Sequence, residues 1–274
     1  MLTDTVPNVL SIAGSDPSGG AGVQADLKTF AALQCHGMAV VAALTAQNTR
    51  GVYAVHIPPV TFLKAQIDAI FADIAVAGVK IGMLGNADTV ATVADRLRQY
   101  APAIVILDPV LTASSGDALS TDDVRAAMMA HLLPLASLVT PNLAEIARLT
   151  ESRVPETEGE MLESGRKLLQ MGAQAVLVKG GHLPGAQAID LLVEPAGVQR
   201  FSAAKLMVAG NHGTGCTLSS AIAAYMARGM ALAPAVAAAK AYVRGALTHS
   251  GQLHVGRGVG PLQHFFQLWP GTRQ

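Results

Sequence analysis

The stretch NVLSIAGSDPSGGAGVQADLKTFAALQ, residues 8–34, contains a strand, a glycine-rich loop and a helix in direct succession. The run NVLSIAG is largely apolar, and in the helical part Val23, Leu27, Phe30 and Leu33 lie on one face. A buried strand that leads through a tight loop into an amphipathic helix begins a βαβ unit. These residues therefore predict an α/β fold whose parallel sheet is covered by helices on both faces.

The same alternation continues along the chain. Further runs that predict strands are AVVAALTAQ (39–47), VYAVHI (52–57), GVKIG (78–82), AIVILDP (103–109), SLVTP (137–141) and AVLVKG (175–180). Residues 188–203 predict a β-hairpin, and residues 215–250 predict two helices interrupted by Arg228, Gly229 and Pro234. No Pro-, Gly- or Ser-rich linker and no repeat divides the chain. We therefore predict one domain, residues 1–274, built on a three-layer, doubly wound, mostly parallel sheet.

Composition limits the classes of function. Of the 274 residues 51% are apolar, and 19 Lys and Arg balance 19 Asp and Glu without any basic run. This balance argues against a nucleic-acid surface or an anionic-membrane surface. Two cysteines are too few for a disulfide scaffold, and residues 1–10 lack the basic start of a signal peptide. We therefore expect a cytoplasmic protein without a membrane span, whose ligands are small molecules.

The loop AGSDPSGGAG (13–22) raises the question of what it binds. Gly14 and Gly19 match the first half of a nucleotide P-loop, but Gly20 and Ala21 stand where that motif needs Lys and Ser or Thr. The spacing also differs from the G-x-G-x-x-G of dinucleotide-binding folds. Glycines without that lysine let a flat molecule approach the backbone closely. We therefore expect this loop to bind a ligand other than phosphate.

A second glycine motif, at Gly213, Thr214 and Gly215, precedes a helix with an apolar face. Closely spaced glycines at a helix start turn backbone N–H groups toward an anion, and the helix dipole adds to the attraction. A plain glycine turn capped by Thr214 or Thr217 is the alternative. We predict that residues 213–216 hold phosphate groups. In a doubly wound fold such loops lie outside the carboxyl ends of the strands.

Seven segments in fixed order together resemble one family. They are AGSDPSGGAGVQADLKTF, TAQNTRGV, KIGML, LDPVLTASSGDAL, TPNLAEIARL, VLVKGGHL and HGTGCTLSSAIAA, followed by the closing VGRGVGPLQHFF. This set is similar to the hydroxymethylpyrimidine/phosphomethylpyrimidine kinases of thiamine biosynthesis, which belong to the ribokinase-like superfamily. The resemblance implies a doubly wound α/β fold, ATP with Mg²⁺ as the phosphoryl donor, a pyrimidine as the acceptor, and a homodimer.

The resemblance also implies which residues bind the acceptor. Ala21 and Met83 would flank the pyrimidine ring, with Val110 nearby. Gln47 would hydrogen-bond the aminopyrimidine edge, because one amide both donates and accepts. Asp26 would border the same pocket and present its carboxylate from the first turns of a helix.

For the nucleotide side, Asn142 and Glu145 fit the family's T-P-N-x-x-E segment, whose acidic residue helps to hold Mg²⁺ through water. Asp108 lies in the D-P-V turn on the same side, and Lys179 would reach the transferring phosphate. Cys216 occupies the position where most ribokinase-like enzymes have an Asp base. Because a helix N-terminus lowers the pKa of a thiol, we expect Cys216 to be a partly ionised base.

The chain departs from the family pattern in two places. Family members commonly read N-T-H-G-T-G-C where this chain has Gly210, Asn211 and His212 before its Gly-Thr-Gly-Cys. In residues 110–117, Ser114 replaces a lysine of the family. His212 would either orient a phosphate or cap the loop, and neither change alters the predicted anion loop.

Two other functions remain open at this point. A pyridoxine or pyridoxal kinase shares the superfamily, the GTGC-type loop and a flat heteroaromatic alcohol as substrate, although Gln47 and Met83 favour the pyrimidine. A catalytically silent pyrimidine-binding sensor is the other alternative. The presence of Lys179, Cys216 and Glu145 argues against it.

Overall fold

The computed structural model describes residues 5–111, 121–208 and 210–269 of the chain. Most of its strands form one sheet: β1 (Asn8–Ser15), β2 (His36–Asn48), β3 (Gly51–His56), β4 (Gly78–Ile81), β5 (Val105–Leu107), β6 (Leu138–Val139), β7 (Val176–Gly180), β8 (Gln187–Glu194) and β9 (Gly197–Ala204). Two short strands, β10 (Gly210–His212) and β11 (Gly260–Pro261), pair with each other outside this sheet. The strands of the main sheet are the runs that the sequence predicts, and the predicted hairpin is β8 and β9.

The helices follow the strands in the predicted alternation. They are α1 (Gly22–Ala32), α2 (Val60–Asp73), α3 (Ala87–Tyr100), α4 (Asp122–Ala127), α5 (Leu143–Thr150), α6 (Glu158–Gln170), α7 (Thr214–Ala227) and α8 (Leu232–Thr248), with short turns at η1 (Met128–Leu132), η2 (Leu133–Leu135) and η3 (Ser250–Gln252). Arg228 and Gly229 separate α7 from α8 as predicted, but Pro234 does not interrupt a helix: it lies in the first turn of α8, where a proline is tolerated. No helix in the described ranges combines the length and the apolar character that crossing a lipid bilayer requires.

The main sheet has the strand order β3-β2-β1-β4-β5-β6-β7-β8-β9. Its centre, from β2 to β7, is parallel, while β3 at one edge and β8 and β9 at the other pair antiparallel. The chain leaves β1 toward β2 on one side and returns through β4 on the other side. This reversal makes a switch point beside β1, which is where doubly wound folds bind ligands. The predicted fold class is confirmed.

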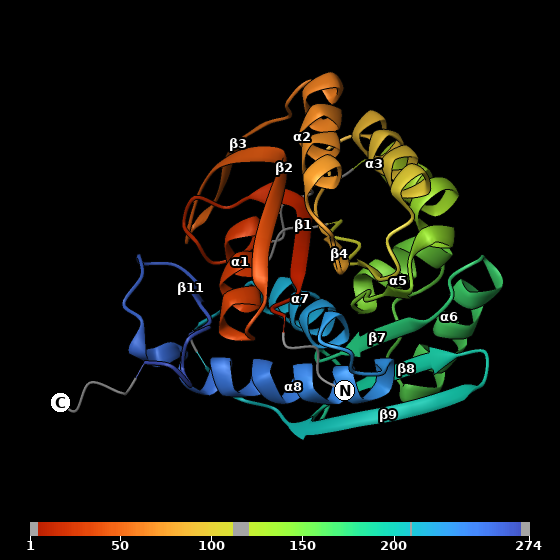
Figure 1. The fold of residues 1–274 in the computed structure, drawn as a ribbon. Coiled ribbons are helices and arrows are strands. Elements are labelled where there is room, and N and C mark those ends of the chain that lie inside the picture. Colours follow the sequence, from red (N-terminus) through yellow and green to blue (C-terminus); the bar gives the residue numbers. More distant parts are fainter. Residues whose placement is uncertain (1–4, 112–120, 209, 270–274) are drawn as a thin grey trace.

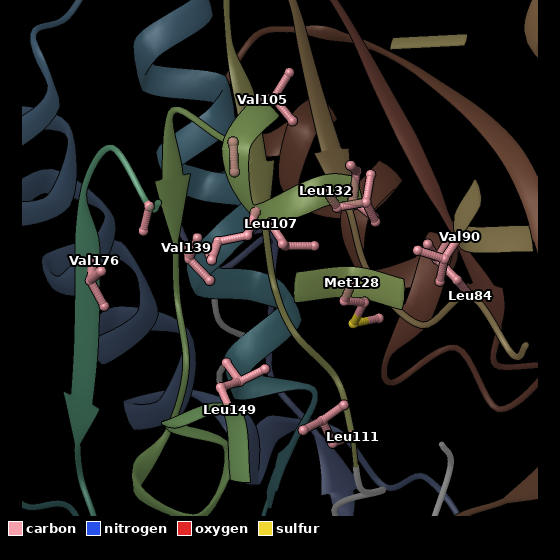
Figure 2. Packing of buried hydrophobic residues seen from close by; sticks show 14 of the residues in the cluster. Leu84, Val90, Val105, Leu107, Leu111, Met128, Leu132, Val139, Leu149 and Val176 are labelled. Carbon is pink, nitrogen blue, oxygen red and sulfur yellow. The ribbon is translucent and has the colours of Figure 1, made fainter. Parts of the chain in front are cut away.

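Helices cover both faces of the sheet, because neighbouring residues of each strand point to opposite sides. In β5, Val105 and Leu107 join one buried cluster with α2, α3 and α6, whereas Ile106 joins a second cluster with α1, α7 and α8 (Figure 1). Figure 2 shows Val105, Leu107, Val139 and Val176 pointing from successive strands into the first cluster. Burying such a side chain contributes about 1.5–3 kcal/mol. The two clusters hold the strand ends, and therefore the loops of the site, in fixed positions.

Candidate active site

A cavity of about 1180 Å³ opens at the carboxyl ends of the parallel strands. Its lining contains all the residues that the sequence assigns to the site except Asp26: Ala21, Gln47, Met83, Asp108, Val110, Asn142, Glu145, Lys179, Gly213, Thr214, Gly215 and Cys216. The fold thus brings together loops that are far apart in the sequence. The volume exceeds the roughly 300–1,000 Å³ of pockets for one drug-sized ligand, so it has room for two reactants.

The part of the cavity next to β1 and β4 has apolar walls. Ala21, Met83 and Val110 line it, and a side chain placed at Gly14 would lie 3.3 Å from the Met83 sulfur. Gln47, near the end of β2, adds an amide that both donates and accepts hydrogen bonds. These walls fit a flat ring with one polar edge.

The predicted anion loop lies at the start of α7. Gly213 has a φ of +86°, and a side chain there would meet the Gly20 carbonyl oxygen at 1.9 Å. The threonines do not cap the helix: the Thr214 hydroxyl donates to the Asn211 carbonyl, and the Thr217 hydroxyl donates to the Gly213 carbonyl. In the described residues no side chain accepts a capping hydrogen bond from this end of α7. The first N–H groups of the helix are thus available to an anion.

Lys179 stands beside the anion loop at the end of β7. Its Nζ lies 3.0 Å from Asp108 Oδ1 and 3.7 Å from Glu145 Oε2, and a side chain at Gly215 would come within 3.2 Å of it. Burial disfavours the charged ammonium, but Asp108 and Glu145 outweigh this effect and raise the pKa of Lys179. Burial likewise disfavours the Asp108 carboxylate, yet Lys179 and Lys80 lower its pKa below the ordinary value.

Glu145 and Asn142 form a capping box at the start of α5. Asn142 Oδ1 accepts the Glu145 N–H at 2.9 Å, and Glu145 Oε2 accepts the Asn142 N–H at 2.7 Å. Burial raises the pKa of Glu145 to about 7. No group of three or more His, Cys, Asp or Glu side chains with metal-ligand geometry occurs in the described chain. The donor set here fits a metal bound through water better than one bound directly.

Cys216 is at the predicted place, in the first turn of α7, but its expected ionisation is wrong. Burial raises the pKa of the thiol to about 11; Lys80 opposes the shift, whereas Asp26 and Asp108 add to it. The helix N-terminus does not overcome these effects. Cys216 is therefore a neutral thiol in the free protein at neutral pH.

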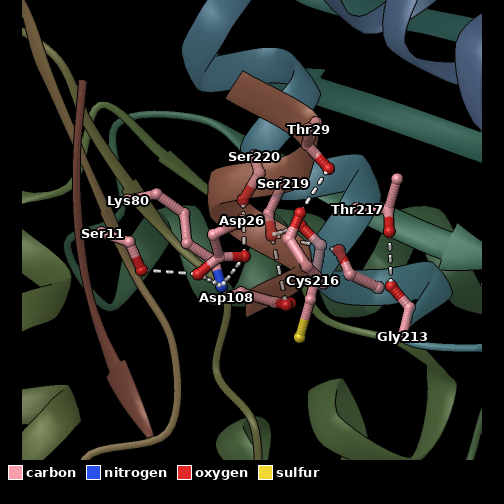
Figure 3. Close-up of polar contacts among 12 residues, drawn as sticks. Ser11, Asp26, Thr29, Lys80, Asp108, Gly213, Cys216, Thr217, Ser219 and Ser220 are labelled. Atoms are coloured by element: carbon pink, nitrogen blue, oxygen red, sulfur yellow. Dashed lines mark hydrogen bonds and ion pairs between the residues drawn. The ribbon is translucent and has the colours of Figure 1, made fainter. Parts of the chain in front are cut away.

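The expectation that Asp26 presents its carboxylate to a ligand is also wrong. Asp26 is fully buried and pairs with Lys80, with 2.9 Å from Nζ to each carboxylate oxygen. Ser11 and Ser220 donate to the same carboxylate at 2.6 and 2.7 Å (Figure 3). All of these partners are protein groups, so the carboxylate is satisfied inside the protein. The sequence analysis overlooked Lys80, although a lysine inside the apolar run GVKIG was the available signal.

His212 lines the cavity and pairs with an acidic residue of the loop at 13–22. Its Nε2 lies 2.8 Å from Asp16 Oδ2, and both side chains are nearly buried. Two of the residues that depart from the family pattern, Gly210 and Asn211, lie in β10. The Asn211 carbonyl accepts a hydrogen bond from the Thr214 hydroxyl. Ser114 lies outside the described residues.

An apolar acceptor pocket that faces an uncapped helix N-terminus and a buried lysine, in a doubly wound sheet, defines a small-molecule kinase of the ribokinase-like class. The family described as phosphomethylpyrimidine kinase matches residues 16–263. The chain belongs to this family.

Individual relatives agree with this assignment. A hydroxymethylpyrimidine/phosphomethylpyrimidine kinase of Rhizobium meliloti is 50% identical, with 95% of this chain and 97% of the relative covered. The Escherichia coli protein of the same name is 49% identical, with 96% and 98% covered. Among solved structures, a pyridoxal kinase from Staphylococcus aureus in complex with AMP-PCP and pyridoxal has a TM-score of 0.88, at 30% identity and with 96% and 95% of the chains covered.

Proposed function

We propose that this protein uses ATP to phosphorylate 4-amino-5-hydroxymethyl-2-methylpyrimidine and then phosphorylates the monophosphate to the diphosphate, in thiamine biosynthesis. The observation that carries the proposal is the single cavity in which Gln47 and Met83 face Lys179 and the start of α7. The names of the relatives support the same acceptor. We also propose that the whole chain acts as one kinase domain, since loops along its length build this cavity.

In this mechanism the chain positions the reactants and stabilises charge, which is most of what phosphoryl transfer needs. Ala21, Met83 and Val110 hold the ring, and Gln47 fixes its amino edge, so that the hydroxymethyl oxygen faces the anion loop. Backbone N–H groups at 213–216 and the Lys179 ammonium stabilise the charge of the transferring phosphoryl group. Asp108 keeps Lys179 charged and in place.

Magnesium, when bound with ATP, would neutralise phosphate charge. Glu145 and Asp108 would hold it through water, because both carboxylates already bind Lys179 or backbone groups. Glu145→Gln should then lower activity and raise the Mg²⁺ concentration needed for half-maximal rate. An unchanged Mg²⁺ titration would leave Glu145 with a capping role alone.

Cys216 is proposed to contact the acceptor oxygen. A neutral thiol does not repel the second acceptor, a phosphate monoester that is mostly dianionic at neutral pH because its second pKa is about 6. For the first acceptor, an alcohol, the thiol acts as a base only in the fraction of molecules in which it ionises. The base role is thus expected to be partial.

A pyridoxal kinase is the second candidate function, because structures at TM-scores of 0.87 and 0.88 are pyridoxal kinases. We further propose a homodimer, since Leu44, Tyr53 and Val55 expose apolar surface on β2 and β3. Size-exclusion chromatography with light scattering tests the dimer.

The test of function is ATP consumption with hydroxymethylpyrimidine, with pyridoxal and without acceptor, followed by separation of the products. We expect the pyrimidine monophosphate and then the diphosphate. Phosphorylation of pyridoxal alone would replace the proposal by the second candidate, and no consumption above background would indicate a binding protein.

Gln47→Ala tests whether acceptor binding and nucleotide binding use different parts of the cavity. Loss of one buried hydrogen-bonding partner typically costs about 1–3 kcal/mol, so the KM for the pyrimidine should rise about ten- to a hundredfold. The KM for ATP should hardly change. A raised KM for ATP with an unaltered KM for the pyrimidine would assign this loop to the nucleotide.

A further inference from the structure

The Asp16 carboxylate organises the acceptor loop. It accepts hydrogen bonds from the Ser18 N–H at 2.9 Å, the Ser18 hydroxyl at 2.7 Å, the Gly20 N–H at 3.2 Å and the Ala21 N–H at 2.9 Å. A single buried carboxylate therefore fixes the backbone from residue 16 to residue 21. Several hydrogen bonds lower the pKa of Asp16 to about 2 although burial opposes this, so the group is ionised at neutral pH.

The same carboxylate binds the segment that leads into the anion loop. Asp16 Oδ2 lies 2.8 Å from Nε2 of His212, the residue directly before Gly213. An ionised carboxylate has no hydrogen to donate, so Nε2 carries the hydrogen of this bond. Asp16 is thus shared between the two loops.

Backbone contacts reinforce this connection. A side chain at Gly20 would lie 2.3 Å from Cδ2 of His212, and one at Gly213 would lie 1.9 Å from the Gly20 carbonyl oxygen. Because neither glycine has room for a Cβ, the two loops touch directly. The Gln47 amide nitrogen lies 3.4 Å from the same His212 Nε2; because Nε2 already donates to Asp16, this is a packing contact and not a hydrogen bond, and it places His212 beside the residue proposed to hold the acceptor.

We propose that the His212–Asp16 pair couples the two halves of the site, so that phosphate groups at the anion loop and the acceptor ring bind with synergy. His212 is here a positioning residue: a ligand that fixes residues 213–216 also fixes His212, Asp16 and the acceptor loop, and the second ligand then has less to order. This inference rests on the proposed function for the identity of the acceptor.

The test measures the dissociation constant of hydroxymethylpyrimidine by calorimetry, without nucleotide and with saturating Mg²⁺ and the β,γ-imido analogue of ATP. Couplings between sites typically change affinity about 5- to 150-fold, and we expect the parent protein to fall in that range. His212→Leu, which removes the donor, should reduce the ratio of the two constants to below about twofold. His212→Gln, whose amide N–H can reach Asp16, should restore part of it.

His264→Gln is the matched control. His264 is also buried, and its Nε2 lies 3.0 Å from Thr217 Oγ1 in the same first turns of α7, without contact to the acceptor loop among its described hydrogen bonds. It should keep the parent ratio. A merely structural role of His212 would lower the stability of His212→Leu and His212→Gln but leave their ratio of constants at the parent value.

The outcomes separate the two proposals. If the parent binds the pyrimidine equally well with and without nucleotide, or if His212→Leu keeps the parent ratio, the coupling is wrong whatever the other variants do. If the pyrimidine does not bind but pyridoxal does, the proposed function is wrong, and the same ratio measured with pyridoxal decides the coupling. If neither binds, both proposals are wrong.

Discussion

Two lysines lie in strands of the same sheet, one fully buried and one partly exposed, and they have different surroundings. Lys80, in β4, is fully enclosed and gives its ammonium to Asp26, whose remaining hydrogen bonds come from serines. Lys179, in β7, is 13% exposed and shares Asp108 and Glu145 at the cavity. The Lys80–Asp26 pair, called the closed pair below, has no polar group left over for a ligand. The cluster of Lys179, Asp108 and Glu145, called the open cluster below, keeps a charge within reach of a ligand. Both lysines are charged and both line the cavity, so the remaining exposure of the side chain and the saturation of its carboxylate partner distinguish a structural lysine from a chemical one.

The largest effect should come from Lys80→Met. Removing one partner of a buried ion pair leaves the other charge uncompensated, which costs about 3–5 kcal/mol of unfolding free energy. Urea denaturation of parent and variant measures it. The double variant with Asp26→Asn should recover most of the loss, because no charge then remains buried alone. A stable single variant with impaired catalysis would instead give Lys80 a chemical role and break the comparison.

The same substitution at Lys179 should act mainly on rate. Loss of one preorganised donor to the transition state typically lowers kcat about 10²–10³-fold, which we expect for Lys179→Met. Its loss of stability should be smaller than that of Lys80→Met, since Lys179 is partly exposed and Asp108 keeps the hydrogen bonds from Thr140 and Ser219. Equal destabilisation by the two substitutions, with normal kcat per folded molecule, would show that both lysines are structural.

Cys216 is close enough to Lys80 and to Lys179 to interact with both charges, so substitutions of this residue extend the comparison. With a thiol pKa of about 11, few molecules carry a thiolate at neutral pH, so Cys216→Ala should slow alcohol phosphorylation by about 10²-fold, the low end of general base catalysis. Phosphorylation of the monophosphate needs no base and should change less. Cys216→Asp should harm the second step more, because a carboxylate repels a dianionic acceptor. Each step is measured with its own acceptor, and equal losses would mean that Cys216 only shapes the anion loop.

The smallest effect should be a change in how stability depends on pH. The pKa of Glu145 is raised from 4.5 to about 7 in the folded protein, so the folded state holds this proton more tightly than the unfolded state. Its contribution to stability is present in full below pH 4.5 and is lost as the pH rises through 7. Glu145→Gln should remove that loss, so its denaturation midpoint should fall less than that of the parent between these pH values. Parallel curves would contradict the raised pKa.

The open cluster was accessible to sequence analysis because each member follows a predicted strand. Lys179 is the second-last residue of AVLVKG, Asp108 is the second-last residue of AIVILDP, and Glu145 follows SLVTP in a helix-start pattern. Parallel strands place their carboxyl ends at one edge, so a correct fold already brings such residues together. The direction of β3 was not predicted, because an alternating run such as VYAVHI fits either pairing.

The closed pair was not accessible in the same way. Asp26 was assigned to the ligand because it follows a glycine-rich loop, and its true partner lies 54 residues further along the chain. Helix periodicity does not say which buried lysine a buried carboxylate meets. The prediction that the Cys216 thiol is partly ionised failed for a related reason. The helix N-terminus can be predicted from the sequence, whereas the burial of the thiol and its proximity to Asp26 and Asp108 appear only in three dimensions.

The hydrogen bond from Ser220 to Asp26 has a consequence for synthesis on the ribosome. β1, α1 and β4 emerge early and can assemble as they leave the exit tunnel, but the serine that completes their ion pair arrives with α7, 194 residues after Asp26. Until then, Asp26 has Lys80 and Ser11 as protein partners, and water takes the place of the missing Ser220 hydroxyl. Docking of α7 is therefore the step that removes the last water from the Asp26 carboxylate.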